Sequence, residues 1–555
     1  MTPTSTAPGL VLAAYQQDPS HVGGSLGLSA LVAVLPLAVV LVLLGVVKTR
    51  AHWAALAGLL TALLVAILAF AMPIGMALLA AAHGAFYGLF PIMWIVVNAL
   101  WVFNMTVATG HFDILRRAFG TFSSDQRTQA ILIGFCFGAL LEALAGFGAP
   151  VAITSVMLVA LGFKPLKAAV VALVANTAPV AFGAMGVPVI TLATVTGLPL
   201  DHVASMVGRQ TPILALFVPL VLVFIVDGRK GVREAWVPAL VCGVVFGIVQ
   251  FLTSNFVSVA LTDILASLVA AAAVLILARA SRQTVWAART PAVAAGGGPG
   301  TAAAPDSPAE IRKAFAPYVI IVLVFALVQL PGIKPAVDSL KLAFKWPGLD
   351  IVGTNGKQLT SSTVQYSLTW LSTAGTLMLI AGVIVAVLLK VGAGRAAATY
   401  GKTLNEMKFA ILTVAAVLAL AYVMNASAQT TAIGLLIAGA GGALAFLSPS
   451  LGWLGVAVTG SDTSANALFG SLQVTAARAT GLPDVLLAAA NSSGGVLGKM
   501  LSPQNLAIGA VAVKMEGDEG ILLRKVIGWS LGMLLVMAIL VALQATPVLG
   551  WMVVR

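Results

Sequence analysis

The stretch Asn176-Thr-Ala-Pro-Val-Ala-Phe-Gly-Ala-Met-Gly-Val-Pro188 has a counterpart in Asn491-Ser-Ser-Gly-Gly-Val-Leu-Gly-Lys-Met-Leu-Ser-Pro503. Both follow the pattern N-[ST]-x5-G-x-M-x2-P, and both lie in apolar sequence of the kind that forms membrane-spanning helices. Glycine and proline interrupt such helices. Broken helices at corresponding positions of two halves are the best sequence indication of a transporter's central binding site. The motif therefore predicts two discontinuous helices, related by an internal repeat, that line a common site.

The composition of the whole chain predicts an all-α polytopic membrane protein. Of its 555 residues, 60% are hydrophobic and only 9% are charged, and the mean hydropathy is +1.05. A water-soluble fold could not bury so much apolar surface, whereas lipid solvates the outside of a helical bundle. The apolar runs suffice for roughly 13 to 16 membrane segments of about 20 residues each.

The formal charge of +12 comes from basic residues that cluster in short loops between the apolar runs. Such loops are typical of the cytoplasmic side of a membrane protein. The first run, about 26–47, is followed by Lys48 and Arg50, which predicts an N-terminus outside the cell. No basic patch is interleaved with aromatic residues, so we expect no nucleic-acid partner. Cys136 and Cys242 lie in apolar helical sequence and are interpreted as buried small side chains.

Two predicted halves flank a low-complexity linker. Residues 283–310 contain a run of Gly, Pro and Ala, which is typical of a flexible connection. We predict an N-terminal transmembrane half over 1–282 with a core unit at 129–198. The C-terminal half covers 311–555 and has its core unit at 451–514. Counting membrane crossings leaves open whether the two core units are inverted or parallel.

Each core unit carries a second interruption upstream of its repeated Asn. Gly146 and Gly148 lie in the first unit, and Ser461-Asp-Thr-Ser-Ala-Asn466 lies in the second. Gly146 and Ser461 each precede the repeated Asn of their unit by 30 residues. This spacing predicts two helix-break-helix elements per unit, which meet near the middle of the bilayer.

The breaks predict a site for a small anion. Unpaired backbone groups cannot face lipid, so they line a cavity or bind something. The N-terminus of a half-helix presents free N–H groups and the positive end of a dipole, and hydroxyls and amides add neutral donors. The alternative is that small residues here only allow tight helix packing. The candidate substrate-binding residues are Gly146, Gly148, Asn176, Thr177, Ser461, Thr463, Asn466, Asn491, Ser492, Ser493 and Lys499.

Three ionisable residues stand out in the core units. Glu142 is the only acid between residues 129 and 200, and ionisable groups at that depth are costly and usually functional. Glu142 and Asp462 are therefore the candidates for carrying a coupled proton. Glu142 could instead be the structural partner of a buried cation, and Asp462 could cap a half-helix. Lys499 could pair with a substrate carboxylate, with either acid, or extend to the membrane interface.

No catalytic pattern accompanies these residues. The chain lacks a G-x-x-x-x-G-K-[ST] loop for ATP, a nucleophile elbow and a cluster of metal-ligating residues. We therefore expect neither an enzyme nor an ATP-driven pump, and no metal or organic cofactor.

At these residues the chain resembles the lactate permease family of bacterial secondary carriers. The resemblance covers nearly the whole chain but not 283–366, and it implies proton-coupled uptake of L-lactate, D-lactate or glycolate across the inner membrane. Glu142 and Asp462 as proton carriers are our physical inference. The stretches that carry the resemblance are GFCFGALLEALAGFGAPVAIT (134–154), LGFKPLKAA (161–169), NTAPVAFGAMGVPV (176–189), LGWLGVAVTGSDTSANALF (451–469) and AANSSGGVLGKMLSPQNLAI (489–508).

Other functions stay open at this point. A sodium-coupled carboxylate transporter of similar broken-helix architecture is the main alternative, although larger anions would call for more cations than Lys499 alone. An anion channel is disfavoured by the buried Glu142, and a membrane-embedded enzyme would need a catalytic group that is not found. The sequence indicates a small monocarboxylate and the lipid bilayer as partners and leaves the oligomeric state open.

Overall fold

The computed structural model describes residues 14–120, 125–146, 148–280 and 307–554. Its regular structure is almost entirely helical, which confirms the predicted all-α membrane fold. Ten described helices are long and apolar enough to cross a membrane, or up to eleven if one bent pair counts as a span. The sequence count was higher because it treated the arms of long helices and several short core helices as separate segments. The predicted linker lies outside the described residues up to 306.

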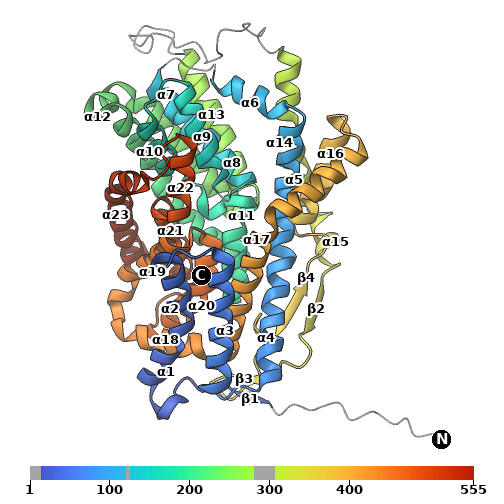
Figure 1. Cartoon of the computed structure of the whole chain (residues 1–555), viewed down its shortest axis with the longest axis vertical. Helices are drawn as coiled ribbons and strands as arrows, with labels where there is room; N and C mark the ends of the chain where they lie inside the picture. Colours follow the sequence, from blue (N-terminus) through green and yellow to red (C-terminus); the bar gives the residue numbers. More distant parts are fainter. Residues whose placement is uncertain (1–13, 121–124, 147, 281–306, 555) are drawn as a thin grey trace, which may run out of the picture.

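The first helices form the lower front and the right side of the molecule in Figure 1. α1 and α2 together make the span predicted over 26–47, and a π-helical segment, Gly88–Met93, joins α4 to α5. The amphipathic helix α6 follows α5. The bounds are Leu26–Ala33 for α1, Leu35–Gly45 for α2, Ala51–Leu68 for α3, Ile74–Tyr87 for α4, Trp94–Ala108 for α5 and His111–Gly120 for α6.

The first core unit is a hairpin of helices followed by a bent span. The hairpin turns between α8 and α9, and a Cβ at Gly138 would contact Thr154 of the returning helix. The two helices of the bent span, α10 and α11, meet at 64° across a 3₁₀ turn at Val180–Phe182. The bounds are Gln126–Gln129 for α7, Ala130–Phe137 for a π-helical segment, Gly138–Leu144 for α8, Ala149–Ala160 for α9, Pro165–Ala175 for α10 and Gly183–Thr196 for α11.

The helix α12 (Leu200–Phe256) is itself a hairpin. At about 1.5 Å per residue its 57 residues would be far longer than a bilayer is thick. The backbone leaves helical geometry at Asp227, Gly228 and Ala235, and a Cβ at Gly243 would lie 2.5 Å from the Leu216 carbonyl. The two arms lie on either side of this turn. α13 (Thr262–Ala280) packs against α12.

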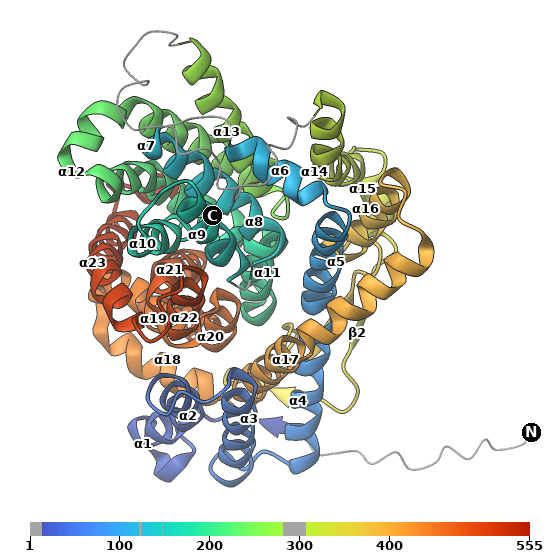
Figure 2. The ribbon, with the colours of Figure 1, turned by 45° about the horizontal axis from the view of Figure 1, so that its top comes forward.

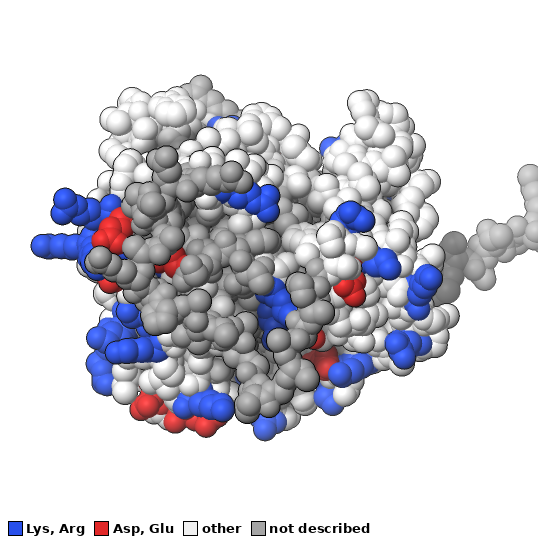
Figure 3. Space-filling view, turned by 90° about the horizontal axis from the view of Figure 1, so that it is seen from above, with Lys and Arg blue, Asp and Glu red and all other residues white. Residues whose placement is uncertain are grey.

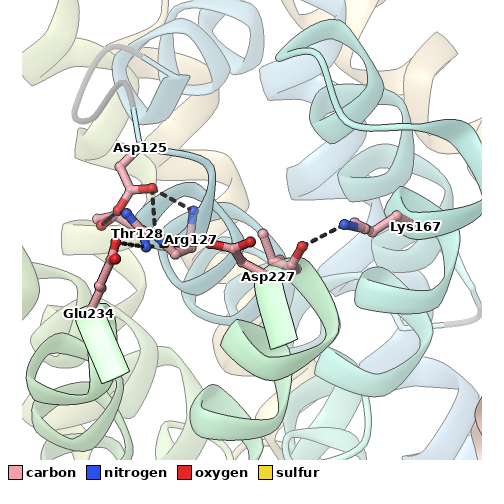
Figure 4. A network of polar contacts seen from close by, with 7 residues as sticks. Asp125, Arg127, Thr128, Lys167, Asp227 and Glu234 are labelled. Carbon is pink, nitrogen blue, oxygen red and sulfur yellow. Dashed lines mark hydrogen bonds and ion pairs between the residues drawn. The ribbon is translucent and has the colours of Figure 1, made fainter. Parts of the chain in front are cut away.

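Charged side chains fix the turn of α12 to the first core unit (Figure 4). Arg127 of α7 contacts Asp125 at 3.0 Å, Glu234 at 2.5 Å and Asp227 at 3.5 Å. Lys167 of α10 donates to the carbonyl of Val226. These contacts hold the start of the first hairpin and the start of the bent span on one side of the molecule.

Short strands lie on the opposite side, and three of the four described strands fall between residues 342 and 368. Here β1 (Tyr15–Gln16) pairs in parallel with β3 (Ile351–Val352), and β2 (Leu342–Lys345) pairs antiparallel with β4 (Gln365–Leu368). The remaining elements of this region are α14 (Pro308–Val328), α15 (Lys334–Asp338), α16 (Ala374–Leu388) and α17 (Ala393–Ala426). Residues 307–310, the end of the predicted linker, form the N-cap and first turn of α14.

The second core unit also combines a hairpin with an interrupted span. α19 and α20 turn at Gly460 and Ser461, and α21 continues into α22 through a 3₁₀ turn at Lys499–Leu501. The last long helix, α23, packs against α19 and α21. The bounds are Gln429–Ile437 for α18, Leu444–Thr459 for α19, Asp462–Thr480 for α20, Asp484–Gly498 for α21, Pro503–Ala512 for α22 and Glu519–Gln544 for α23.

The two core units lie together and approach from opposite faces (Figures 1 and 2). The first hairpin begins at the face with α6 and α7. The second begins and ends near the face with α1 and the strands, where Pro483 lines the same crevice as Leu198 and Pro199. This arrangement is inverted, which answers the question that the crossing count left open. Figure 3 shows the α6–α7 face, where Lys and Arg side chains are more frequent than Asp and Glu in the part left visible. Kinship of the two units through an internal repeat stays a prediction.

Candidate functional site

The break in the first hairpin depends on glycine. Gly146 and Gly148 have φ angles of +49° and +85°, which glycine adopts without steric cost. Gly148 is the N-cap residue of α9, and a Cβ there would lie 2.4 Å from the side chain of Ile508 in α22. The first hairpin can therefore bring its tip against the second core unit.

The break after α10 contains a left-handed turn. Asn176 ends α10, and the backbone of Ala184, Met185 and Gly186 has positive φ before regular helix resumes. Positive φ is uncommon for residues with a Cβ, and surrounding contacts must hold it in place. The carbonyl of Pro188, just beyond this turn, accepts a hydrogen bond from Asn466 Nδ2 at 3.1 Å. The bent span of one unit is thus joined to the hairpin of the other.

Serine caps both half-helices of the second core unit. Ser461 accepts from the backbone N–H of Ser464 at 3.2 Å at the start of α20. Ser502 accepts from the backbone N–H of Asn505 at 3.3 Å at the start of α22. N-cap hydroxyls satisfy one of the free N–H groups of a helix start and leave others available. Both half-helices therefore present positive dipole ends near the breaks.

A buried ion pair joins the two core units. Lys499 Nζ lies 2.5 Å from Glu142 Oε1, and the side chains are only 7% and 4% exposed. Asn176 Nδ2 donates to the other carboxylate oxygen, Oε2, at 3.0 Å. Of the partners considered for Lys499, the structure selects Glu142, and the lysine does not extend to the membrane interface. Glu142 therefore also fits its alternative interpretation, that of the structural partner of a buried cation.

Asp462 lies in a second polar group without a direct cation. Its Oδ2 accepts from Ser492 Oγ at 2.6 Å and from Asn466 Nδ2 at 3.2 Å. Asn491 Nδ2 donates to Asn466 Oδ1 at 2.9 Å and so supports this arrangement from behind. Asp462 Oδ1 is buried and has no hydrogen-bond partner among the residues that the structure describes. This oxygen lies against Gly495 of α21. Asp462 is not the N-cap residue of α20, because Ser461 has that role.

A small cavity of about 60 Å³ separates these groups. Both hairpin tips and both second breaks contribute to its wall, so the four interruptions meet at one place. Of the predicted site residues, its lining includes Glu142, Gly146, Ser461, Asp462, Thr463 and Lys499. The cavity thus contains two acids and one cation, and Lys499 is the only positive side chain among the described residues of its wall.

The other predicted site residues lie behind the wall. Thr177, just beyond the end of α10, donates to the carbonyl of Val174 in that helix at 2.6 Å. Ser493 Oγ is buried, and no partner for it occurs in the described ranges. Gly148 contacts α22 as described above. Asn176, Asn466, Asn491 and Ser492 reach the cavity only through the acids or amides that they hold.

Sequence reasoning missed several residues of the cavity. Gln504 and Asn505 line it from the start of α22, and the signal for them was the sequence Ser502-Pro503, a typical N-cap and first helical residue. Gly183 also lines it, and a Cβ there would lie 2.8 Å from Glu142 Oε1. The second row of the site includes Gln473, which donates to Asn491 Oδ1 at 3.4 Å. Only three-dimensional packing reveals that contact.

The charges of the cavity favour an anion only under one condition. Lys499 already has a carboxylate partner, and Asp462 adds further negative potential. A second carboxylate placed here would be repelled unless a proton neutralised one of the acids, because buried charges need compensation. The arrangement can therefore link the binding of a carboxylate to the binding of a proton.

Known proteins resemble this chain over nearly its full length. The glycolate permease GlcA of Escherichia coli (strain K12) is 43% identical and covers 96% of this chain and 98% of its own length. The L-lactate permease of Bacillus subtilis (strain 168) is 40% identical, covering 97% of this chain and 100% of its own length. Among solved structures, the YdaH transporter of Alcanivorax borkumensis matches 86% of this chain and 89% of its own, with 15% identity and a TM-score of 0.47.

The family relation follows from the extent of these matches. The L-lactate permease family matches residues 29–548, a range that contains both broken core units, the buried ion pair and every residue of the cavity wall. The L-lactate permease of Escherichia coli (strain K12) adds 40% identity over 96% of this chain and 98% of its own length. This multi-pass membrane protein belongs to the L-lactate permease family.

Proposed function

We propose that this chain is a secondary active transporter that carries lactate or glycolate into the cell together with a proton. Membership of the L-lactate permease family supports the class of protein, and the names of the relatives support the substrates. The single observation that carries the proposal is the buried Glu142–Lys499 pair on the wall of a cavity between two broken core units.

The size of the cavity supports a small substrate. Its volume of about 60 Å³ is well below the roughly 300–1,000 Å³ typical of drug-sized ligand sites. A monocarboxylate with a few heavy atoms suits such a space better than a di- or tricarboxylate. A single cation, Lys499, also suits a single carboxylate, since each further buried negative charge would need its own compensation.

The ion pair suggests how a proton and a carboxylate could be coupled. When Glu142 takes up a proton on Oε1, its charge disappears and the attraction for Lys499 falls. The freed ammonium group then receives the carboxylate of the substrate, so the site keeps the same number of charged pairs. The carboxyl group of Asp462, on the wall of the cavity, can accept a hydrogen bond from the 2-hydroxyl group of the substrate. Asp462 remains the second candidate for the coupled proton.

The charge of the two faces supports an orientation in the cytoplasmic membrane of a bacterium. Basic side chains surround the α6–α7 face, and by the positive-inside rule this face is cytoplasmic. The N-terminal strand β1 and the paired β3 then lie on the outer side. In this orientation the first hairpin approaches the cavity from the cytoplasm and the second from outside. The proposed cycle uses the proton as coupling ion and needs no other cofactor.

Uptake of labelled L-lactate by proteoliposomes tests the proposal. The lumen is made one pH unit more alkaline than the medium, and sodium is replaced by choline on both sides. With one proton per substrate, a gradient of one unit supports up to about tenfold accumulation, because it is worth about 1.4 kcal/mol. Glycolate should compete and citrate should not. Accumulation that requires sodium and ignores the pH gradient would instead support a sodium-coupled carboxylate transporter.

A further inference from the structure

Asp263 is a third buried acid that the proposed coupling does not use. It lies in the first turn of α13 and has no exposed surface. Its Oδ1 accepts a hydrogen bond from Gln250 Nε2 at 2.9 Å. Its Oδ2 is buried, and no described residue forms a hydrogen bond with it. A carboxyl group with one amide donor is poorly suited to stay ionised at this depth.

The three buried acids differ in the support that each receives. Glu142 contacts the ammonium group of a lysine and accepts a hydrogen bond from an asparagine amide. Asp462 accepts hydrogen bonds from a serine hydroxyl and an asparagine amide. Asp263 accepts one hydrogen bond, from the amide of Gln250, and no described cation contacts it. Burying an ionised carboxylate without a counter-charge costs several kcal/mol. Asp263 is therefore the acid among the three that most readily holds a proton at rest.

Among the charged and titratable groups on the elements packed against α13, Glu142 is the candidate proton partner of Asp263. α13 packs against α12, the π-helical segment before α8, α8 itself and α11. Glu142 lies on α8, which packs directly against α13. Between the π-helical segment and α12, Cys136 and Cys242 face each other at 3.5 Å. On α12, Arg209 is turned to Asn255 and the carbonyl of Met552, and α11 carries no titratable residue.

The loop that precedes Asp263 lies between an open crevice and the substrate cavity. The loop that leads into α13 contributes Ser258, Val259 and Ala260 to a crevice of about 530 Å³ on the side of the strands. The same loop packs on the left-handed turn of the first core unit, where a Cβ at Gly186 would lie 2.6 Å from Val259. Ala184 of that turn lines the cavity. This loop therefore separates the two spaces, and Asp263 follows it directly in the first turn of α13.

We propose that Asp263 takes up a proton from this crevice and passes it to Glu142. The step breaks the O–H bond of Asp263, whose carboxylate keeps the electron pair and the hydrogen bond from Gln250. It forms an O–H bond on Glu142, which then releases Lys499 to the substrate. A second proton from the crevice restores Asp263. This inference rests on the proposed symport with protons and adds to it a proton-carrying residue outside the substrate cavity.

Two assays on Asp263→Asn in proteoliposomes test the inference. Asparagine keeps the size of the side chain and imitates the protonated acid, but it cannot release a proton. We expect accumulation of L-lactate under a one-unit pH gradient to fall from up to about tenfold to about onefold. Counterflow, the exchange of labelled for unlabelled lactate without net proton movement, should stay within about twofold of the wild type. Asp113→Asn, which changes an exposed acid of α6, should match the wild type in both assays.

The outcomes separate this inference from the proposed function. If wild-type protein itself shows no accumulation driven by the pH gradient, the proposed symport fails. If wild-type protein accumulates lactate and Asp263→Asn does so equally, only the role of Asp263 fails. Loss of counterflow together with accumulation would also overturn it, because a packing role explains that result. Partial return of accumulation in Asp263→Glu, with counterflow intact, would support proton transfer.

Discussion

The two copies of the repeated motif form similar breaks but contribute different chemistry. In the first copy Asn176 donates directly to the carboxylate of Glu142. In the second copy Asn491 donates to Asn466, which in turn holds Asp462. The variable position after the shared glycine is Ala184 in one copy and Lys499 in the other, and both residues line the cavity. The shared positions determine where the helix ends, and the variable position determines the charge at the site.

The largest effect should come from removing the charge that distinguishes the copies. In Lys499→Met the Glu142 carboxylate loses its counter-charge, and breaking a buried pair costs about 3–5 kcal/mol. Glu142 would take up a proton in compensation, and the substrate carboxylate would have no cation. We expect counterflow of lactate to fall at least about 100-fold. The exposed Lys514→Met in the same unit should leave it unchanged.

The double variant Glu142→Gln/Lys499→Met sharpens this test. It removes both charges, so the folded protein should regain thermal stability relative to Lys499→Met alone, while transport stays absent. Transport at wild-type rates in Lys499→Met would show that the motif's variable position does not provide the substrate's partner.

The shared glycines should respond differently to the same substitution. In Gly498→Ala the new Cβ would lie 2.2 Å from the carbonyl of Trp453, which is backbone and cannot move aside cheaply. In Gly183→Ala it would lie 2.8 Å from Glu142 Oε1, which is the end of a side chain. We expect Gly498→Ala to lower the thermal midpoint strongly, and Gly183→Ala to fold but to show altered pH dependence of uptake. Gly509→Ala, with only ordinary contacts nearby, is the control.

Equal stability of the two glycine variants would contradict this account. It would mean that the second break has the same freedom as the first, and that its close packing against α19 is not required for the fold.

The smallest effects should separate the two asparagines. Asn176→Ala removes a hydrogen bond to a charged group, which is worth about 1.5–3 kcal/mol, whereas Asn491→Ala removes an amide–amide bond worth about 0.5–1.5 kcal/mol. We expect the first variant to shift the pH profile of uptake and the second mainly to lower stability. Transport kinetics at several pH values, with thermal unfolding measured in parallel, checks both. The comparison fails if Asn491→Ala shifts the pH profile more than Asn176→Ala.

Much of the fold was predictable because its causes are local in sequence. Apolar runs of sufficient length predicted the membrane spans, and glycine and proline predicted the helix breaks at Gly146 and Ser461. The pairing of Tyr15 with Ile351 was not predicted, because a two-residue strand carries no local signal and its partner is far away in sequence.

The site was predictable in its charges and not in its contacts. Glu142, Asp462 and Lys499 stood out because ionisable residues are rare in apolar helices. Which of them would pair depended on how the two units approach each other, and this depends on packing over the whole chain. Thr177 and Ser493 matched the pattern of donors, but a helix directs neighbouring side chains to different sides, so they lie behind the cavity wall.

The opposed approach of the two hairpins has a consequence for access. Each tip closes one side of the same small chamber, one at Gly146 and the other at Gly460 and Ser461. Withdrawal of a single tip would open the chamber to one aqueous compartment while the other tip still seals it. A pair of independent gates around one fixed ligand position is sufficient for alternating access, without a continuous channel at any stage.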